Sequence, residues 1–420
     1  MTVNIKDFGA VGDGKTLNTK AIQAAIDKVG EKGGRVLIED GVYMTGTIIY
    51  KSNVEIHIAS DAVLLGSPDC DDYPEKETVH VNSPLLPRWR NACLIFAEEC
   101  ENISLTGMGT IDCNGNTFVI DEQWGNAWKY HRDFSRPTPP RCVFFTGCKN
   151  VKVEDITMVN QPAGWSYWIH DCDYVSFDKC KIDAEVEYPN NDGIHINSSR
   201  NVTISNCSIR CGDDCLIVRA NNVSLKENKV CERVVITNCN LTSYSAGIRI
   251  GWINDGVIRN CTFSNLVFTD CSCGIDFKLP YIRQTKENPS SADIGREATL
   301  IENMTFDNII MDMAYTAPVN IDIDPNPDVK VEAVRNLYFS NMHVRGPQFP
   351  WINGRKENHV ENVEFNNCSF TLTDGTEFPD RHSHGASRHG HHESEVYHPM
   401  NIQYADNIRF NNTAFNVDKG

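Results

Sequence analysis

A short repeat dominates the chain from about residue 100 onward. Each copy begins with Asn or a substitute, continues with alternating apolar and polar residues, reaches Asn-Cys or a related pair, and ends in another short alternating run. Clean copies start 24 to 33 residues apart, as from Asn150 to Tyr174 and from Asn303 to Asn336. This alternation has the two-residue period of strands and lacks the period of helices. The copies begin at Asn150, Tyr174, Asn201, Arg233, Val257, Asn303, Asn336, Asn362 and Asn407.

The repeat length predicts stacked coils. A unit of about 20–30 residues with a few short strands cannot bury its inner face alone, whereas stacked units bury one continuous core. We therefore predict an all-β protein, a right-handed single-stranded parallel β-helix that forms one domain over residues 1–420. The Asn residues are expected at corners, because Asn tolerates the left-handed backbone conformation and its amides can form ladders between coils. Repeat cysteines are expected in one inward column, namely Cys207, Cys239, Cys261 and Cys368.

An open β-helix exposes end strands that need a cap. Residues 18–29 have the apolar spacing of an amphipathic helix, Asn18 is of a residue type that forms N-caps, and the Gly-rich run from Gly30 to Gly34 ends the helix. We expect this capping α-helix within an N-terminal cap region of residues 1–45.

The chain holds 17 cysteines, which fit a disulfide framework, metal sites or buried free thiols. A chain of 420 residues does not need disulfides for stability, and no paired Cys-x-x-Cys spacing typical of zinc is present. We favour buried free thiols, which are typical of a reducing compartment. The start, from Met1 to Asp7, lacks the pattern of a signal peptide. We expect a cytoplasmic protein, with a secreted mature form as the alternative.

The charge balance limits the partners. The net charge of −17 argues against nucleic acid and anionic membranes, and disfavours a polyanionic substrate unless basic residues gather at the site. No apolar run of 18 residues is present, so no membrane span is expected. The oligomeric state is left open.

Residues 373–400 depart from the repeat and are rich in histidine between Arg381 and His398. Imidazoles suit zinc or nickel, so a metal site is one interpretation. We favour a long solvated loop inserted near the C-terminal end, and we expect neither a metal nor a cofactor.

Two carboxylate motifs are the strongest chemical signal. The first runs from Asn190 to His195 and contains Asp192, and the second contains Asp213 and Asp214. Asp192 and Asp213 are 21 residues apart, close to one coil, so the motifs are expected on neighbouring strands about 4.8 Å apart. Crowded carboxylates raise at least one pKa, as a general acid requires. Turn-capping Asp residues are the structural alternative, which we disfavour for three acids in register.

These motifs resemble those of glycoside hydrolase family 28, the polygalacturonase family of the pectin-lyase-like β-helix superfamily. The Asn-x-Asp-Gly motif of the family matches Asn190 to Gly193, and its Gly-Asp-Asp-Cys motif matches Gly212 to Cys215. The segments Asp7 to Gly14 and Gly33 to Val36 are similar to a signature of such β-helices. The resemblance implies that Asp213 protonates the glycosidic oxygen. It also implies that Asp192 and Asp214 hold and deprotonate the attacking water, with inversion of configuration.

Two family motifs are changed. The Gly-His-Gly segment reads Tyr244 to Gly251 here and contains no histidine, and the Arg-x-Lys motif keeps Lys278 but has Asp276 in place of arginine. The resemblance implies that such basic residues hold a galacturonate carboxylate, so plain polygalacturonate is a weaker expectation. Arg249 is either a replacement cation or an exposed strand residue. Asp276 is expected to tune a pKa or to bind a hydroxyl of an uncharged sugar.

Aromatic residues near the motifs favour a sugar ligand, because sugar rings stack on aromatic faces. Trp165, Tyr167, Trp168 and His170 are expected one coil before Asp192, in register with His195, with core packing as the alternative for one of the aromatics. Residues expected to wall the cleft are Trp124, Trp128, Tyr130 and Trp252.

The leading hypothesis is an inverting glycoside hydrolase that cleaves a pectin-related glycan or oligosaccharide of galacturonic acid or rhamnogalacturonan type. A walled cleft favours exo attack on chain ends. The alternatives are a β-helix polysaccharide lyase, in which the acids bind Ca²⁺ and a basic residue abstracts a proton, and a carbohydrate-binding β-helix without activity.

Overall fold

The computed structural model describes residues 1–75, 92–121, 129–133, 135–139, 141–222, 225–281, 297–312, 316–373 and 400–418. These residues form two compact units. The first unit holds the described residues up to His195 together with Ser199–Gly212, and the second holds Ile196–Ser198 and the described residues from Asp213 onward. The expectation of a single domain over 1–420 stays a prediction.

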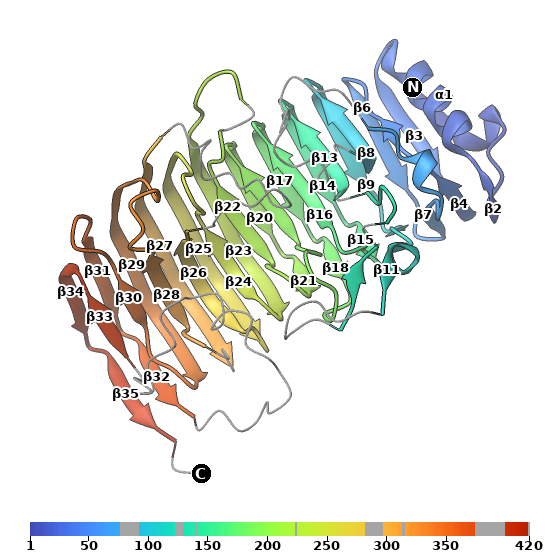
Figure 1. The fold of residues 1–420 in the computed structure, drawn as a ribbon. Helices are drawn as coiled ribbons and strands as arrows, with labels where there is room; N and C mark the ends of the chain where they lie inside the picture. Colours follow the sequence, from blue (N-terminus) through green and yellow to red (C-terminus); the bar gives the residue numbers. More distant parts are fainter. Residues whose placement is uncertain are drawn as a thin grey trace. The chain divides into compact units, whose positions relative to one another are not determined.

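The first unit consists of parallel strands in three rows, in which each strand pairs with the next coil (Figure 1). The first row is β1 (Thr2–Asn4), β3 (Gly34–Ile38), β6 (Val54–Ile58), β9 (Glu101–Thr106), β14 (Lys149–Glu154), β17 (Asp173–Asp178) and β20 (Arg200–Ser205). The second row is β2 (Asp13–Leu17), β4 (Gly41–Thr45), β7 (Ala62–Gly66), β10 (Thr110–Asp112), β15 (Thr157–Val159), β18 (Lys181–Asp183) and β21 (Ser208–Cys211). The third row is β5 (Ile48–Ile49), β8 (Cys93–Glu98), β13 (Arg141–Thr146) and β16 (Trp165–His170).

The second unit has two such rows. The long row is β23 (Cys231–Ser243), β25 (Val257–Thr269), β27 (Thr299–Asp312) and β29 (Val331–Gly346), followed by β31 (Val360–Asn366) with β32 (Ser369–Leu372), and by β34 (Ala405–Asn411) with β35 (Ala414–Val417). The short row is β22 (Leu216–Arg219), β24 (Ala246–Ile250), β26 (Cys273–Leu279), β28 (Val319–Ile323), β30 (Trp351–Asn353) and β33 (Asn401–Gln403). The remaining elements are β19 (Ile194–Asn197), the antiparallel pair β11 (Val119–Ile120) and β12 (His131–Arg132), and the 3₁₀ helices η1 (Ile5–Phe8), η2 (Cys70–Asp72) and η3 (Gly115–Phe118). The predicted parallel β-helix is confirmed.

The capping helix is also present. α1 (Thr19–Gly30) buries Ile22, Ala25, Ile26 and Val29 and contacts β1, β3, β5 and β6 near the N-terminus (Figure 1). Asn18 occupies the N-cap position, but its side chain makes no capping bond to the helix. Its amide instead donates to the carbonyl oxygens of Val11 and Thr16, and its oxygen accepts from the Val11 amide, so Asn18 fastens the preceding loop. Among the described residues, no helix is both long and apolar enough to cross a membrane.

Asparagines at the corners have the predicted left-handed backbone and form side-chain ladders. Asn303, Asn336 and Asn362 all have φ between 56° and 57°. The Asn336 amide donates to Asn303 Oδ1 at 3.0 Å, and the Asn362 amide donates to Asn336 Oδ1 at 3.0 Å. Each corner therefore adds both a tight turn and a bond to the next coil.

The cysteines are free thiols, and all except Cys70 are buried, as predicted. The single cysteine column is wrong, because Cys239 lies in register with Leu266 whereas Cys261 pairs with Val234. The cause is that a coil has two left-handed corners, as at Asn260 and Asn265, and Cys261 follows the first of them whereas Cys239 follows the second, at Asn238. The sequence pattern Asn-Cys does not distinguish these corners.

Candidate functional site

The first group of candidate residues lies in the first unit, around Asp192. The carboxylate Oδ2 of Asp192 lies 2.8 Å from His195 Nε2, and both side chains are buried. The imidazole stacks on Trp165, with ring centroids 3.8 Å apart and planes 16° apart. The Trp165 ring and the Asp192 carboxylate thus hold the imidazole from two directions, which fixes the orientation of the acid.

The loop before Asp192 is held against Gly212 by one side chain. Asn190 is half-buried, and its φ is 55°. Asn191 is fully buried, and its Oδ1 accepts from the Gly212 amide at 2.7 Å while its Nδ2 donates to the Glu185 carbonyl at 2.5 Å. A Cβ at Gly212 would lie 2.3 Å from the Tyr188 carbonyl oxygen, so only glycine fits there.

The neighbouring aromatics divide between site and core. Trp165 is half-buried, whereas Tyr167 is fully buried and is the core residue of the set. Trp168 stacks on Phe144 at a centroid distance of 4.4 Å. The Nδ1 atom of His170 lies 3.1 Å from Thr146 Oγ1, and the ring is 1% exposed. Trp168 and His170 are therefore packed behind Trp165 rather than presented to solvent.

Sequence reasoning missed two buried arginines in this group. The Arg141 guanidinium lies 3.7 Å from the centre of the Trp168 ring and 4.8 Å from that of Trp165. Arg132 donates to the Ala163 carbonyl and interacts electrostatically with Asp192. Burial lowers the pKa of both guanidinium groups, which still leaves them charged near neutral pH. Neither residue lies in a motif, so only their burial identifies them.

The second group lies in the second unit, around Asp214. Its Oδ1 accepts from Ser245 Oγ at 2.7 Å, from the Ala246 amide at 3.0 Å and from Arg249 Nη2 at 3.1 Å. Arg249 Nε lies 3.0 Å from the other carboxylate oxygen. Burial raises the pKa of Asp214, the Arg249 charge opposes this rise, and the charge of neighbouring Asp213 adds to it. The Asp214 carboxylate is thus fixed by its hydrogen-bond donors, and its protonation depends on Arg249.

Asp213 is 2% exposed, and its backbone carbonyl accepts from Ser243 Oγ. The expectation of Arg249 as an exposed strand residue is wrong, because Arg249 is buried against Asp214 and its guanidinium lies 4.8 Å from the centre of the Trp252 ring. Trp252 therefore belongs to this group through Arg249.

Asp276 and Lys278 extend the second group along β26. Asp276 is in register with Arg249 on one side and with Asn320 on the other. Its Oδ1 accepts from Asn320 Nδ2 at 2.7 Å. Lys278 is buried and in register with Asp322. Polar side chains are thus buried in successive strands of the short row, which is unusual for a sheet face without a ligand.

Three other predictions concern the cleft-wall residue Tyr130, the tryptophans Trp124 and Trp128, and the insertion at residues 373–400. Tyr130 packs edge-on against Tyr188, with centroids 5.1 Å apart. Trp124 and Trp128 lie outside the described residues. The same holds for nearly all of the 373–400 insertion, so its metal and loop interpretations both stay predictions.

Comparison with known proteins finds matches to two family models. The model for glycosyl hydrolases family 28 matches residues 87–230, and the model for rhamnogalacturonase A/epimerase, pectate lyase-like proteins matches residues 2–116. A probable polygalacturonase of Vitis vinifera is 30% identical over 291 residues, which cover 66% of this chain and 57% of that protein. An exopolygalacturonase of Arabidopsis thaliana is 28% identical over 236 residues, which cover 54% of this chain and 49% of that protein.

The crystal structure of a hyperthermoactive exopolygalacturonase from Thermotoga maritima has the same fold, with a TM-score of 0.69 and 20% identity over 99% of this chain and 92% of that one. The matches span about half of the length of the two curated relatives. The resemblance to the polygalacturonase-like family 28 of glycosyl hydrolases that the sequence motifs predicted is confirmed.

Proposed function

We propose that the protein is an inverting glycoside hydrolase that removes units from the end of a galacturonate-containing pectic chain. The observation that carries this proposal is that two buried acids are each held by a neighbouring side chain. Asp192 contacts His195, and Asp214 forms an ion pair with Arg249. The match to the family 28 model supports hydrolysis, and the names of the curated relatives support a pectic substrate.

The two groups of residues act, in this proposal, as one active site. Asp192 and Asp213 are separated by 21 residues, close to one coil of the repeat. The Gly212 amide, one residue before Asp213, is bonded to Asn191, one residue before Asp192. This bond joins the residues that precede the two acids in the sequence.

Asp213 acts as the general acid that protonates the glycosidic oxygen. Asp192 and Asp214 hold the attacking water and accept its proton. The residues that orient them suit these roles, because His195 holds the Asp192 carboxylate in place and the Arg249 charge favours the ionised form of Asp214 that binds and deprotonates water. A water between acid and base gives inversion of the anomeric centre.

Buried cations support an acidic sugar. Arg249 and Lys278 lie in the short row, and Arg141 lies over the Trp165 and Trp168 rings. A guanidinium held on an aromatic face can bind a carboxylate in a fixed geometry. The half-buried Trp165 offers a ring for stacking a terminal sugar, and the name of the Arabidopsis relative supports exo attack.

The test is product analysis on pectic oligosaccharides, both uronic and neutral, with wild type and Asp213→Asn compared. We expect saturated galacturonate monomer as the first product of wild type, an inverted anomer in early proton NMR spectra, and loss of both in the variant. A mixture of oligomers at early times would contradict exo attack. An unsaturated product that absorbs in the ultraviolet and depends on Ca²⁺ would instead indicate a lyase.

A further inference from the structure

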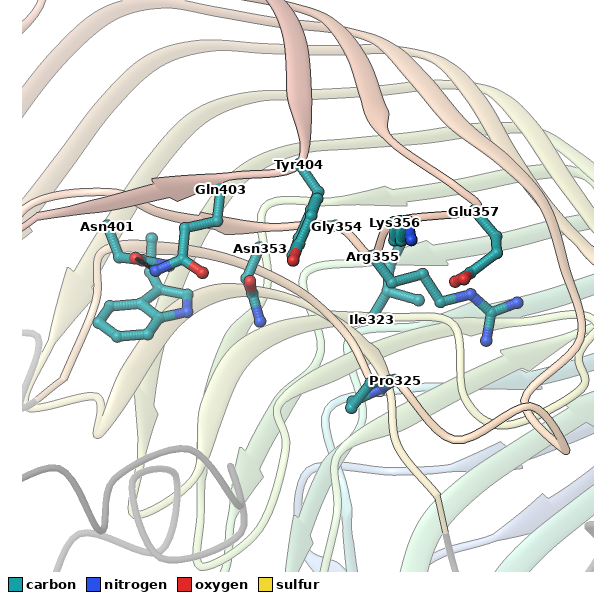
Figure 2. A pocket seen from close by; sticks show the side chains of 11 residues that line it. Ile323, Pro325, Asn353, Gly354, Arg355, Lys356, Glu357, Asn401, Gln403 and Tyr404 are labelled. Atoms are coloured by element: carbon teal, nitrogen blue, oxygen red, sulfur yellow. Dashed lines mark hydrogen bonds between the residues drawn. The ribbon is translucent and has the colours of Figure 1, made fainter.

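A cavity of about 530 Å³ opens at the far end of the short row in the second unit, beside β28, β30 and β33 (Figure 2). Two aromatic side chains, Trp351 and Tyr404, contribute to its lining, together with the amides Asn353 and Gln403. Figure 2 shows Asn353, Gln403 and Tyr404 close together on one side of the cavity. Aromatic faces with neighbouring amide groups are the surfaces that bind sugar rings and their hydroxyls.

This cavity continues the polar face that carries Arg249 and Lys278. The strand register aligns Arg249 with Asp276, then Asn320, then Trp351. A parallel column runs from Lys278 through Asp322 and Asn353 to Gln403, and Asn353 Nδ2 donates to Asp322 Oδ1 at 2.9 Å. Three strand steps of about 4.8 Å separate β24 from β30, so Trp351 lies roughly 14 Å along the row from Arg249.

The charge of the cavity opposes that of the whole chain. Arg355 and Lys356 line it with one acid, Glu357, whereas the chain carries a net charge of −17. Arg355 is held in place, because its Nε donates to Asn358 Oδ1 at 2.9 Å and its Nη1 donates to the Asn326 carbonyl at 3.1 Å. Lys356 is exposed and makes no ion pair within the described residues. A fixed guanidinium and an available ammonium favour a carboxylate ligand.

We infer that this cavity is a distal subsite that binds a uronic acid unit of the substrate about three strands from the cleaved bond. The inference rests on the proposed function for its choice of substrate. Tyr404 and Trp351 contact the ring, the amides bind hydroxyls, and Lys356 with Arg355 binds the carboxylate. Short oligosaccharides do not reach the cavity, so it contributes affinity only to longer ones.

The test measures the binding of octagalacturonate and digalacturonate by calorimetry, with Asp213→Asn as the background so that no ligand is consumed. We expect Tyr404→Ala and Lys356→Gln each to weaken octagalacturonate binding about fivefold or more, and to leave digalacturonate binding unchanged. The matched controls are Tyr338→Ala, at a tyrosine of similar exposure on the long row, and Lys149→Gln, at an exposed lysine of the first unit. Melting curves confirm that each variant is folded.

Equal octagalacturonate affinity in the cavity variants and the controls would overturn the inference, even if the wild type hydrolyses galacturonides. Equal weakening of octagalacturonate and digalacturonate binding would also overturn it, because the cavity would then not distinguish long from short ligands. Selective weakening in a protein that hydrolyses no galacturonide would uphold the cavity as a uronate site and contradict only the proposed function.

Discussion

Arg249 and Asp214 form an ion pair, and the protonation of Asp214 in the second group depends on it. The buried carboxylate has a raised pKa, and the Arg249 charge is the main interaction that opposes this rise. Arg249 also lies over the Trp252 ring, so its position is fixed by packing as well as by charge. The pair links the second carboxylate motif to a residue of the segment that replaces the Gly-His-Gly motif.

Replacing Arg249 with methionine should raise the pKa of Asp214 further, because the opposing charge is removed. Activity that needs the ionised carboxylate falls as the pH drops through this pKa, so the acidic limb of the kcat/KM profile should move to higher pH. We expect about a tenfold loss or more at neutral pH. Arg259→Met, which breaks the pair between the partly exposed Arg259 and the buried Glu232 on the long row, is the control and should leave the profile unchanged. An unmoved acidic limb in Arg249→Met would contradict this role.

His195 can be tested with two substitutions that separate its contacts. His195→Phe keeps a ring for stacking on Trp165 but removes the bond to Asp192, whereas His195→Gln keeps a polar group but loses the stack. If orientation of Asp192 is what matters, His195→Phe should lower kcat about 10- to 100-fold. His195→Gln should lower it less. The opposite order would assign His195 to sugar stacking instead.

The motifs were enough to predict the acids but not their partners. Asp192, Asp213 and Asp214 were recognised from local spacing, which a sequence shows directly. Arg141 and Arg249 act through burial and through contacts with side chains many residues away, such as Trp168 and Asp214. Such contacts depend on strand register, which one sequence does not reveal.

At the scale of the elements, the corner asparagines bond each coil to the next through their side chains. Asn336 is bonded through its side chain to Asn303 and Asn362, and its φ of 56° disfavours most side chains. Asn336→Ala loses both the ladder and the conformational tolerance of asparagine.

We expect Asn336→Ala to destabilise the fold by about 1–3 kcal/mol in urea unfolding. Asn336→Gly removes the ladder but accepts the backbone angle, so its cost should be smaller. The difference between the two variants measures the strain, and the cost of the glycine variant measures the ladder. Equal stability of wild type and both variants would contradict a structural role of the corner.

The coil architecture followed from the repeat because its period of two residues and its unit length leave few other folds. The register within a coil did not follow, as Cys261 shows. Its Asn-Cys pair resembles that at Cys239, yet the two residues occupy different positions in the coil. Two corners with the same local chemistry can be separated only by their neighbours in the adjacent coil.

At the scale of the whole molecule, charge sets the approach of the substrate. The net charge of −17 repels a polyuronate at long range, whereas the buried cations act only on contact. Added salt should screen the repulsion more than the contacts. KM for octagalacturonate should therefore fall about twofold or more between roughly 20 and 200 mM salt. KM should rise with salt if long-range attraction dominates, which would contradict this account.

The central claim is that Asp192, Asp213 and Asp214 work as one site. The most direct measurement is kcat/KM on an oligogalacturonide for the three single Asp→Asn variants and for the triple variant. Substitutions at residues that act as a unit have non-additive effects on activity, so the triple variant should be about as impaired as the worst single variant. Losses that multiply across the three positions, or a single variant with wild-type activity, would contradict one shared active site.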